Sequence, residues 1–299
     1  MKIVWKMFHH TPTTILLLLS VTLVGATSNM RRRMGESIAG ECRTPYSKHE
    51  NEVMREAFEK INLDKRQTTE IVFDVHFNVV AANITEAGGW VPDSQIERQF
   101  EMLREGFSGH GIFFQFGSTT RILSSNWHHN LNVPEDDILE RMLINYGTLF
   151  RKGGATSLNI NLILFGSDDE TYGFGLPPSL YRAYPELDGI YVRFTSLPGG
   201  ASRARQGSTA VHEAGHWLGL WHTFQDGCEG EGDGVADTPA EAGPASGCPI
   251  GRDSCPTLPG LDPVQNWMDY SAEGCRDSFT AGQVARMQAA SRYRIDVLS

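Results

Sequence analysis

The eleven residues from His212 to His222, HEAGHWLGLWH, hold the side chains best suited to chemistry in this sequence. His212 and His216 are four residues apart, so on a helix their imidazoles project only ~40° apart, one turn from each other. Two nitrogens in that arrangement reach one tetrahedral zinc ion. Glu213 lies ~100° round the helix, where it borders the metal without pointing at it, as a base for a metal-bound water would. The spacing therefore predicts a hydrolytic zinc site.

His222 can join this site only if the helix stops before it. On a continuous helix it would lie ~240° round from His216, facing the opposite side. Gly219 supplies the break, because glycine adopts left-handed dihedrals without steric cost. With 31 glycines and 10 histidines in 299 residues, requiring both at fixed positions removes chance matches roughly 300-fold. We therefore predict three zinc ligands rather than histidines packed on an ordinary helix.

The elements that must position this motif are predicted from hydrophobic periodicity. Alternating or continuous apolar runs indicate strands over residues 71–79, 112–116, 158–165 and 189–194. Caps and apolar faces indicate helices that begin near residue 93, at residues 134–137 and after residue 280. Strands that alternate with helices imply an α/β (α+β) layer with a mixed sheet. In the last helix, Val284, Met287 and Ile295 are expected to face the core.

The N-terminus predicts export. Lys2 and Lys6 precede an apolar run near ten residues long, and small residues follow at 24–26, as in a cleaved signal peptide; a membrane anchor is the alternative. We assign residues 1–26 to a signal peptide, 27–50 to a propeptide or flexible leader containing Arg31–Arg33, and 51–299 to the main domain. No later apolar stretch approaches ~18 residues, so no membrane association is expected after cleavage.

Charge and cysteines narrow the class further. The net charge of −10 and the lack of a basic stripe argue against a nucleic-acid partner. In an oxidising compartment, Cys228, Cys248, Cys255 and Cys275 are expected to form two disulfides, for which three pairings are open. Residues 226–263 are rich in Gly, Pro and Asp, so cross-links or ions must order them. Asn83 begins the one glycosylation sequon.

The motif and its surroundings resemble a known family. HEAGHWLGLWH fits the metzincin pattern HExxHxxGxxH, and residues 266–270 (NWMDY) resemble the methionine turn of that group. LDGIYVRFTSLPGG, HTFQDGC, GDGVADTPAE, GCPIGRDSC and FTAGQVARM resemble the pappalysin-type metzincins, peptidase family M43, particularly fungal and bacterial extracellular metalloproteases. The resemblance covers residues 70–299 and is densest over 187–288.

This resemblance implies a zincin-like catalytic domain with a twisted mixed sheet, an active-site helix and an irregular, disulfide-tied C-terminal subdomain. It implies that Glu213 is the general base and later the proton donor. Met268 would pack beneath the zinc, and Tyr270 would donate to the oxyanion, unless it is only a core tyrosine supporting the turn. The implied disulfides are Cys228–Cys255 and Cys248–Cys275.

Three further features carry alternatives. Relatives bind calcium in this region, so Asp233, Asp237 and Thr238 would be its ligands, or else form ordinary Asx turns. Cys42 would act as a cysteine switch that blocks the zinc, although the usual following glycine is replaced by Arg43; a free or intermolecular thiol is the alternative. Gly274 stands where some relatives carry the acid that selects a basic residue. Glu273 and Asp277 are nearby but not assumed equivalent.

The sequence as a whole predicts a secreted, monomeric zinc endopeptidase that acts on extracellular proteins. A processing protease with one specific substrate is the alternative within the same class. A zinc-binding module without turnover is the alternative from another class, and the presence of both Glu213 and Tyr270 argues against it.

Overall fold

The fold was analysed in a computed structural model that describes residues 41–64, 70–133, 136–166 and 170–299. The predicted signal peptide and the arginine run at residues 31–33 lie outside the described residues.

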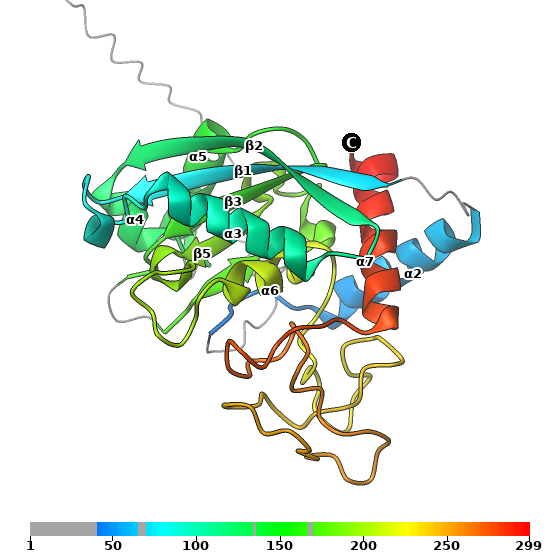
Figure 1. Cartoon of the computed structure of the whole chain (residues 1–299). Helices are drawn as coiled ribbons and strands as arrows, with labels where there is room; N and C mark the ends of the chain where they lie inside the picture. The colour runs from blue at the N-terminus through cyan, green and yellow to red at the C-terminus, as the bar shows by residue number, and fades with distance from the viewer. Residues whose placement is uncertain (1–40, 65–69, 134–135, 167–169) are drawn as a thin grey trace, which may run out of the picture.

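The centre of the molecule is a five-stranded twisted sheet (Figure 1). Its strands in spatial order are β2 (Ile112–Leu123), β1 (Ile71–Ala81), β3 (Ser157–Ile163), β5 (Ile190–Arg193) and β4 (Gly173–Gly175). The first four are parallel, and β4 runs antiparallel to β5 at the sheet edge. The predicted mixed sheet is confirmed, but β2 continues past Phe116 because it pairs with β1 along its whole length.

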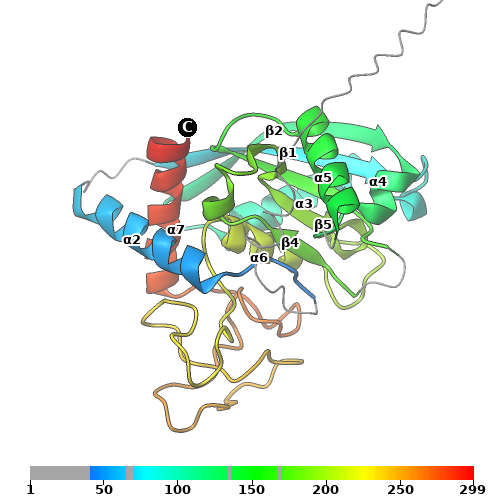
Figure 2. The same cartoon turned by 180° about the vertical axis from the view of Figure 1, so that it is seen from behind.

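Helices cover both faces of this sheet. Helices α3 (Asp93–Gly106) and α6 (Ser208–Trp217) pack on one face against the alternating apolar side chains of β1. Helices α4 (Ser125–Asn130) and α5 (Asp137–Phe150) lie on the other face, as the reverse view in Figure 2 shows for α5. Four single 3₁₀ turns connect these elements: Glu86–Gly88, Pro178–Leu180, Pro185–Leu187 and Phe194–Ser196.

Two helices outside the sheet brace the end of α6. Helix α2 (Lys48–Asp64), which the sequence patterns do not indicate, packs against the C-terminal α7 (Ala281–Tyr293) (Figures 1 and 2). The buried Arg294 guanidinium donates to the carbonyl of Trp217 and pairs with Asp188 at 2.9 Å. The C-terminal end of α6 is therefore anchored to the end of the chain.

The prediction that Ile295 faces the core is wrong. Met287 is fully buried, but Ile295 is 39% exposed. The chain changes from an α-helix to a π-helix at Arg294, and the wider turn rotates the following side chains out of the face that Met287 occupies. Arg294 takes the inward position instead.

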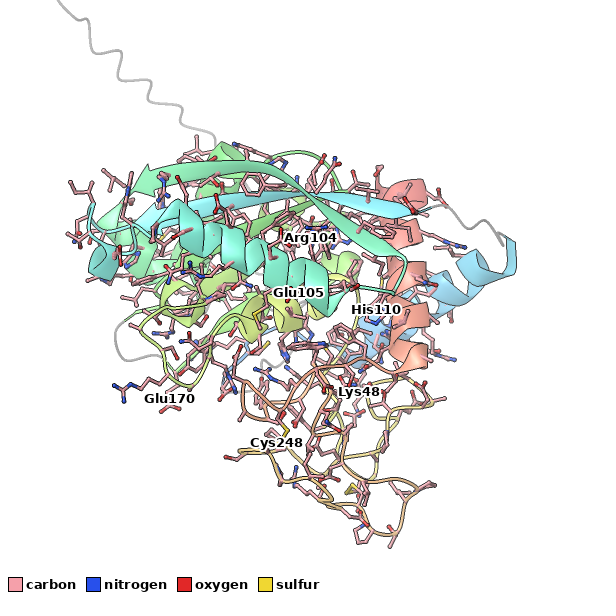
Figure 3. All side chains as sticks on the ribbon, viewed as in Figure 1. Lys48, Arg104, Glu105, His110, Glu170 and Cys248 are labelled. Atoms are coloured by element: carbon pink, nitrogen blue, oxygen red, sulfur yellow. A yellow bond between two sulfur atoms is a disulfide. The ribbon has the colours of Figure 1, made fainter. Side chains whose placement is uncertain are left out.

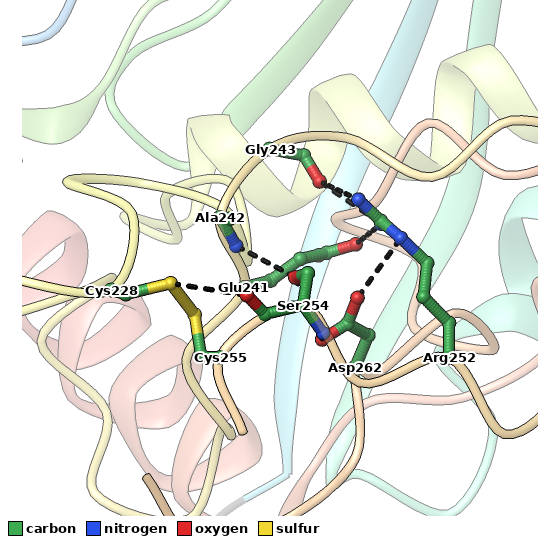
Figure 4. The surroundings of a disulfide bond; sticks show 8 residues. All are labelled: Cys228, Glu241, Ala242, Gly243, Arg252, Ser254, Cys255 and Asp262. Carbon is green, nitrogen blue, oxygen red and sulfur yellow. Dashed lines mark hydrogen bonds and ion pairs between the residues drawn. A yellow bond between two sulfur atoms is a disulfide. The ribbon is translucent and has the colours of Figure 1, made fainter. Parts of the chain in front are cut away.

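Residues 218–280 contain no helix or strand and form the irregular subdomain below α6 (Figures 1 and 3). The disulfides Cys228–Cys255 and Cys248–Cys275 confirm the pairing that the resemblance implies. Each spans a sequence separation of 27 residues, worth about 3.5 kcal/mol in the chain-entropy model. Beside the first, Arg252 bridges the buried carboxylates of Glu241 and Asp262 (Figure 4). Cross-links and ion pairs thus replace a large apolar core here.

Candidate active site

The turn at Gly219 has the geometry that the three-histidine interpretation requires. Helix α6 ends at Trp217, and Gly219 adopts φ of +84°. The amide of Leu220 donates to the carbonyl of Gly215, and the amide of Gly219 donates to that of His216. This pair of bonds is a Schellman cap. It reverses the chain and returns His222 to the side of the helix that carries His216.

The ring nitrogens of the three histidines converge. The Nε2 atom of His216 lies 3.1 Å from Nε2 of His212 and 3.1 Å from Nε2 of His222. Nitrogens that share one tetrahedral zinc, each at ~2.0–2.1 Å, would lie ~3.3 Å apart. These distances therefore fit a metal held by all three.

The hydrogen bonds of the rings fix the tautomer that a metal needs. Nδ1 of His212 lies 2.7 Å from the carbonyl of Trp267, and Nδ1 of His216 lies 2.8 Å from that of Leu220. A carbonyl can only accept, so both Nδ1 atoms carry the proton and both Nε2 atoms present a lone pair. Burial lowers the pKa of His216 to about 4 and the pKa values of His212 and His222 well below the ordinary range. The donor set is neutral and suits zinc.

Replacing Gly219 with alanine is expected to damage this site specifically. An added Cβ would lie 3.2 Å from the Phe58 ring, and φ of +84° is strained for any other residue. We expect a loss of about 1–2 kcal/mol of stability and faster zinc release, because His222 moves. Zinc content after dialysis against a weak chelator measures the effect. Gly154→Ala is the control, since nothing lies within 4 Å of its Cβ position; equal zinc retention in both variants would contradict the role of the turn.

Met268 lies beneath the helix, as the resemblance implies. It is fully buried, and its sulfur would be 2.5 Å from a Cβ added at Gly215. The glycine in the helix therefore lets the methionine turn approach the backbone between the two histidines. The carbonyl of the preceding residue, Trp267, orients His212, so the turn supports the histidine cluster from below.

Hydrogen bonds from helix α2 and from Arg286 also hold the turn that leads to His222. The Oδ1 atom of Asn51 on α2 accepts from Nε1 of Trp221 at 2.7 Å and from Arg286 at 2.6 Å. Arg286 also donates to the carbonyl of Gly219 at 2.6 Å. No sequence pattern marks these residues, because they come from three segments distant in the chain.

Glu213 lies between the histidines and the sheet edge. It is 1% exposed, and its Oε1 would be 2.6 Å from a Cβ added at Gly173 in β4. The glycine of the edge strand therefore leaves room for the carboxylate. Burial raises the pKa of Glu213 to about 8, which suits a group that takes and returns a proton near neutral pH. Gly173-Phe174-Gly175 is a site element that periodicity did not reveal.

The segment of residues 41–46 crosses the site beside β4. The amides of Tyr172 and Gly173 donate to the carbonyl of Glu41, and the amide of Arg43 donates to that of Gly173. Cys42 forms a parallel bridge with Gly173. The segment therefore pairs with the sheet edge through a single parallel bridge, as bound peptides pair with edge strands.

This pairing places Cys42 at the centre of the site. Its sulfur lies within 4.8 Å of the ligand nitrogens of all three histidines, the one such cluster in the described part of the chain. The sulfur is 3.3 Å from Oε2 of Glu213, and the hydroxyl of Thr44 donates to the same oxygen at 3.1 Å. Burial, followed by the charge of Glu213, raises the pKa of the Cys42 thiol. A thiolate here therefore needs a cation beside it.

Tyr270 completes the ring of polar groups around the metal position. Its hydroxyl lies 3.2 Å from Nε2 of His222 and donates to the carbonyl of Cys42 at 3.1 Å. The hydroxyl thus already interacts with a peptide carbonyl that lies in the site. This contact is of the kind that an oxyanion donor would make.

The remaining predicted site residues lie away from this centre. The Asp237 carboxylate accepts from the hydroxyl of Thr280 and the amide of Gly282, so it caps α7. Oδ2 of Asp233 and Oγ1 of Thr238 are buried without a hydrogen-bond partner among the described residues. Asn83 is exposed in the loop after β1. Calcium binding and glycosylation remain predictions.

Comparisons with known proteins decide the family. Residues 190–291 match the peptidase M43 family, described as "Pregnancy-associated plasma protein-A". The chain is 41% identical over 221 residues to an extracellular metalloprotease of Pyricularia oryzae, covering 73% of this chain and 74% of that protein. A Verticillium alfalfae extracellular metalloprotease is 36% identical over 281 residues, covering 90% and 94%. The chain belongs to the peptidase M43 family.

Solved structures share the fold of this chain. Mature mirolysin of Tannerella forsythia, in complex with a cleaved peptide, has a TM-score of 0.61 at 26% identity and covers 77% of this chain and 99% of its own. A promirolysin mutant of the same organism has a TM-score of 0.65 at 24% identity, covering 87% and 99%. The protein is a zinc metalloendopeptidase with a metzincin fold. In the described residues, no helix is long and apolar enough to cross a membrane.

Proposed function

We propose that this M43 enzyme is secreted and cleaves internal peptide bonds of extracellular proteins, with Glu213 as general base. The observation that carries the proposal is the convergence of three neutral histidine nitrogens beside a buried carboxylate. The extracellular names of its relatives support secretion. A monomer that acts without nucleic acid remains our expectation.

Each residue of the site has a separate role in the proposed peptide hydrolysis. His212, His216 and His222 would hold zinc, which polarises the scissile carbonyl and acidifies water when bound. Glu213 takes a proton from the attacking water and returns it to the leaving amine. Tyr270 donates its hydroxyl to the developing oxyanion, a role for which its contact with the Cys42 carbonyl is the supporting geometry.

The segment of residues 41–46 would keep the enzyme latent. Cys42 occupies the position beside the histidines where substrate must react, and Thr44 engages the proposed base. A bound zinc ion would place positive charge beside the buried Cys42 sulfur and so favour its thiolate form as a ligand. Proteolysis that removes this segment would open the site, while Asn51 must stay to hold the His222 turn.

The proposal also includes a calcium site and a glycosylation site. A calcium ion beside Asp233 and Thr238 would coordinate two buried oxygens that have no hydrogen-bond partner in the part of the chain that the structure describes. Burial raises the pKa of Asp233 to about 7, and a bound cation would return this carboxyl to its charged form. Asp237 is already used in capping α7. Asn83 would carry a glycan, since it is exposed.

Metal removal tests the proposed function. Activated protein should cleave casein, and 1,10-phenanthroline should reduce the rate at least ~100-fold, because the metal and Glu213 act as one unit. Zinc added in slight excess over the chelator should restore activity. The non-chelating 1,7-phenanthroline is the control. Chelator-resistant cleavage would rule out the mechanism, and zinc binding without any cleavage would favour the non-catalytic module. Cleavage of only one or a few proteins would favour the processing protease.

A further inference from the structure

A small pocket that contains two arginines opens beside His212 and Glu213. Its walls include Glu41, Tyr172, Arg205, Thr209, Tyr270 and Arg276. Both arginines are almost fully buried, with 4% of the surface of Arg205 and 5% of that of Arg276 exposed. Buried cations need a partner or they destabilise the fold, so the partners of these two arginines are informative.

The two acids that flank Gly274, Glu273 and Asp277, do not line the pocket. Glu273 uses both carboxylate oxygens on Ser208, on the amide at 2.9 Å and on the hydroxyl at 2.6 Å. Asp277 is exposed and Gly274 carries no side chain. The acidic residues near the methionine turn therefore do not offer a carboxylate for a basic substrate residue.

Arg205 has one carboxylate partner in the described residues, and that partner belongs to the segment that must leave. Its Nη2 pairs with Glu41, the residue before Cys42. Its other contacts are carbonyls, including those of Tyr270 at 3.0 Å and Ser271 at 3.1 Å. When the segment departs, a buried guanidinium beside the reacting centre loses its carboxylate.

Arg276 adds to the positive charge of the pocket. It donates to the carbonyl of Asp269 and to the hydroxyl of Ser208, and its Nε is buried with no partner in the described part of the chain. Burial, followed by the charge of Arg205, lowers the pKa of Arg276 to about 10. The group stays charged at neutral pH, so once Glu41 has left, two arginines and one carboxylate, that of Glu213, line the pocket.

We infer that this pocket is a specificity site for an acidic side chain, Asp or Glu, at one of the two residues that flank the scissile bond. The Glu41 carboxylate, which the segment already inserts against Arg205, shows the contact that such a substrate residue would make. This inference rests on the proposed peptidase function and names the substrate class that the site selects. A charged hydrogen bond lost with no replacement costs more than a neutral one, so selection against lysine should be strong.

Cleavage profiling of the mature enzyme with a peptide library tests the inference directly. We expect Asp and Glu to be enriched at one position next to the cut. Matched fluorogenic peptides that carry Glu, Gln or Lys at that position should then give kcat/KM about 10- to 100-fold higher for Glu than for Gln. Enrichment of Lys or Arg, or no preference for acids, would overturn the inference.

Variants identify the residue responsible. Arg205→Gln should bring the Glu-to-Gln ratio to within about threefold of one, if Arg205 supplies the selectivity. The ratio is the readout rather than the absolute rate, because Arg205 also holds the carbonyl of Tyr270. Arg203→Gln, two residues away and exposed, is the matched control and should keep the wild-type ratio. A wild-type ratio in Arg205→Gln would overturn the assignment.

The outcomes separate this inference from the function on which it rests. If no peptide and no casein is cleaved, the proposed function fails. If casein and library peptides are cleaved by a chelator-sensitive activity without acidic preference, only the specificity inference fails. Should Arg205→Gln not fold, the wild-type profile and the matched peptides still decide the question.

Discussion

Replacement of Glu213 by glutamine is expected to lower kcat by about 10²- to 10⁴-fold, the contribution of a positioned general base. Glutamine fills the same space and cannot take a proton, so the chemistry changes while the packing does not. The carboxylate is buried, and its Oε2 accepts from Cys42 and Thr44 while its Oε1 has no partner in the described structure. None of these contacts is an ion pair with a basic side chain, so the substitution breaks no such pair. Steady-state kinetics on a quenched peptide measures the loss, with zinc content determined on the same samples.

The zinc content distinguishes a lost base from a lost metal. We expect Glu213→Gln to keep its zinc, because the three histidine nitrogens converge without help from this carboxylate. Glu97→Gln on the exposed surface of α3 makes the same chemical change far from the cluster and should retain full activity. A Glu213→Gln enzyme with more than about a tenth of wild-type activity would contradict the role of base catalyst.

The second large effect concerns latency. The full-length Cys42→Ser precursor should be active before any cleavage, whereas the wild-type precursor should be nearly silent. If about 99% of precursor molecules have a blocked site, the precursor shows only about 1% of the mature activity. Unblocking the site would then raise its peptidase rate by up to ~100-fold. Serine keeps the size of the side chain but is a poor zinc ligand, because its hydroxyl stays protonated where a thiol ionises beside the metal. Precursor activity measured with serine and cysteine protease inhibitors present gives the result.

The mature enzyme provides the control for this experiment. After limited proteolysis removes residue 42, wild-type and variant proteins have the same sequence and should show equal kcat/KM. The intermolecular-thiol alternative predicts instead that the wild-type precursor forms a disulfide-linked dimer on non-reducing gels. The 2% exposure of Cys42 disfavours that outcome. A Cys42→Ser precursor that is folded and as silent as the wild type would show that the segment blocks the site without its thiol.

Much of the site was determined by local sequence. Spacing of four residues on one helix puts His212 and His216 on one face, and a glycine three residues further on permits the reversal that recruits His222. These are properties of a single continuous segment, so no tertiary information is needed to predict them. The same holds for the sheet strands, whose apolar alternation matches the buried residues of β1.

Tertiary structure decided what lies around that segment. The edge strand β4 is three residues long and glycine-rich, so it has no periodicity to detect, yet it positions both Glu213 and Cys42. Arg205 becomes a pocket residue only because Glu41 and the carbonyls of the methionine turn approach it from distant parts of the chain. The role of a single arginine cannot be predicted from its neighbours in the sequence, because it depends on which charged groups the fold places beside it. The sequence by itself therefore determined which three histidines converge, and the fold decided which groups surround them.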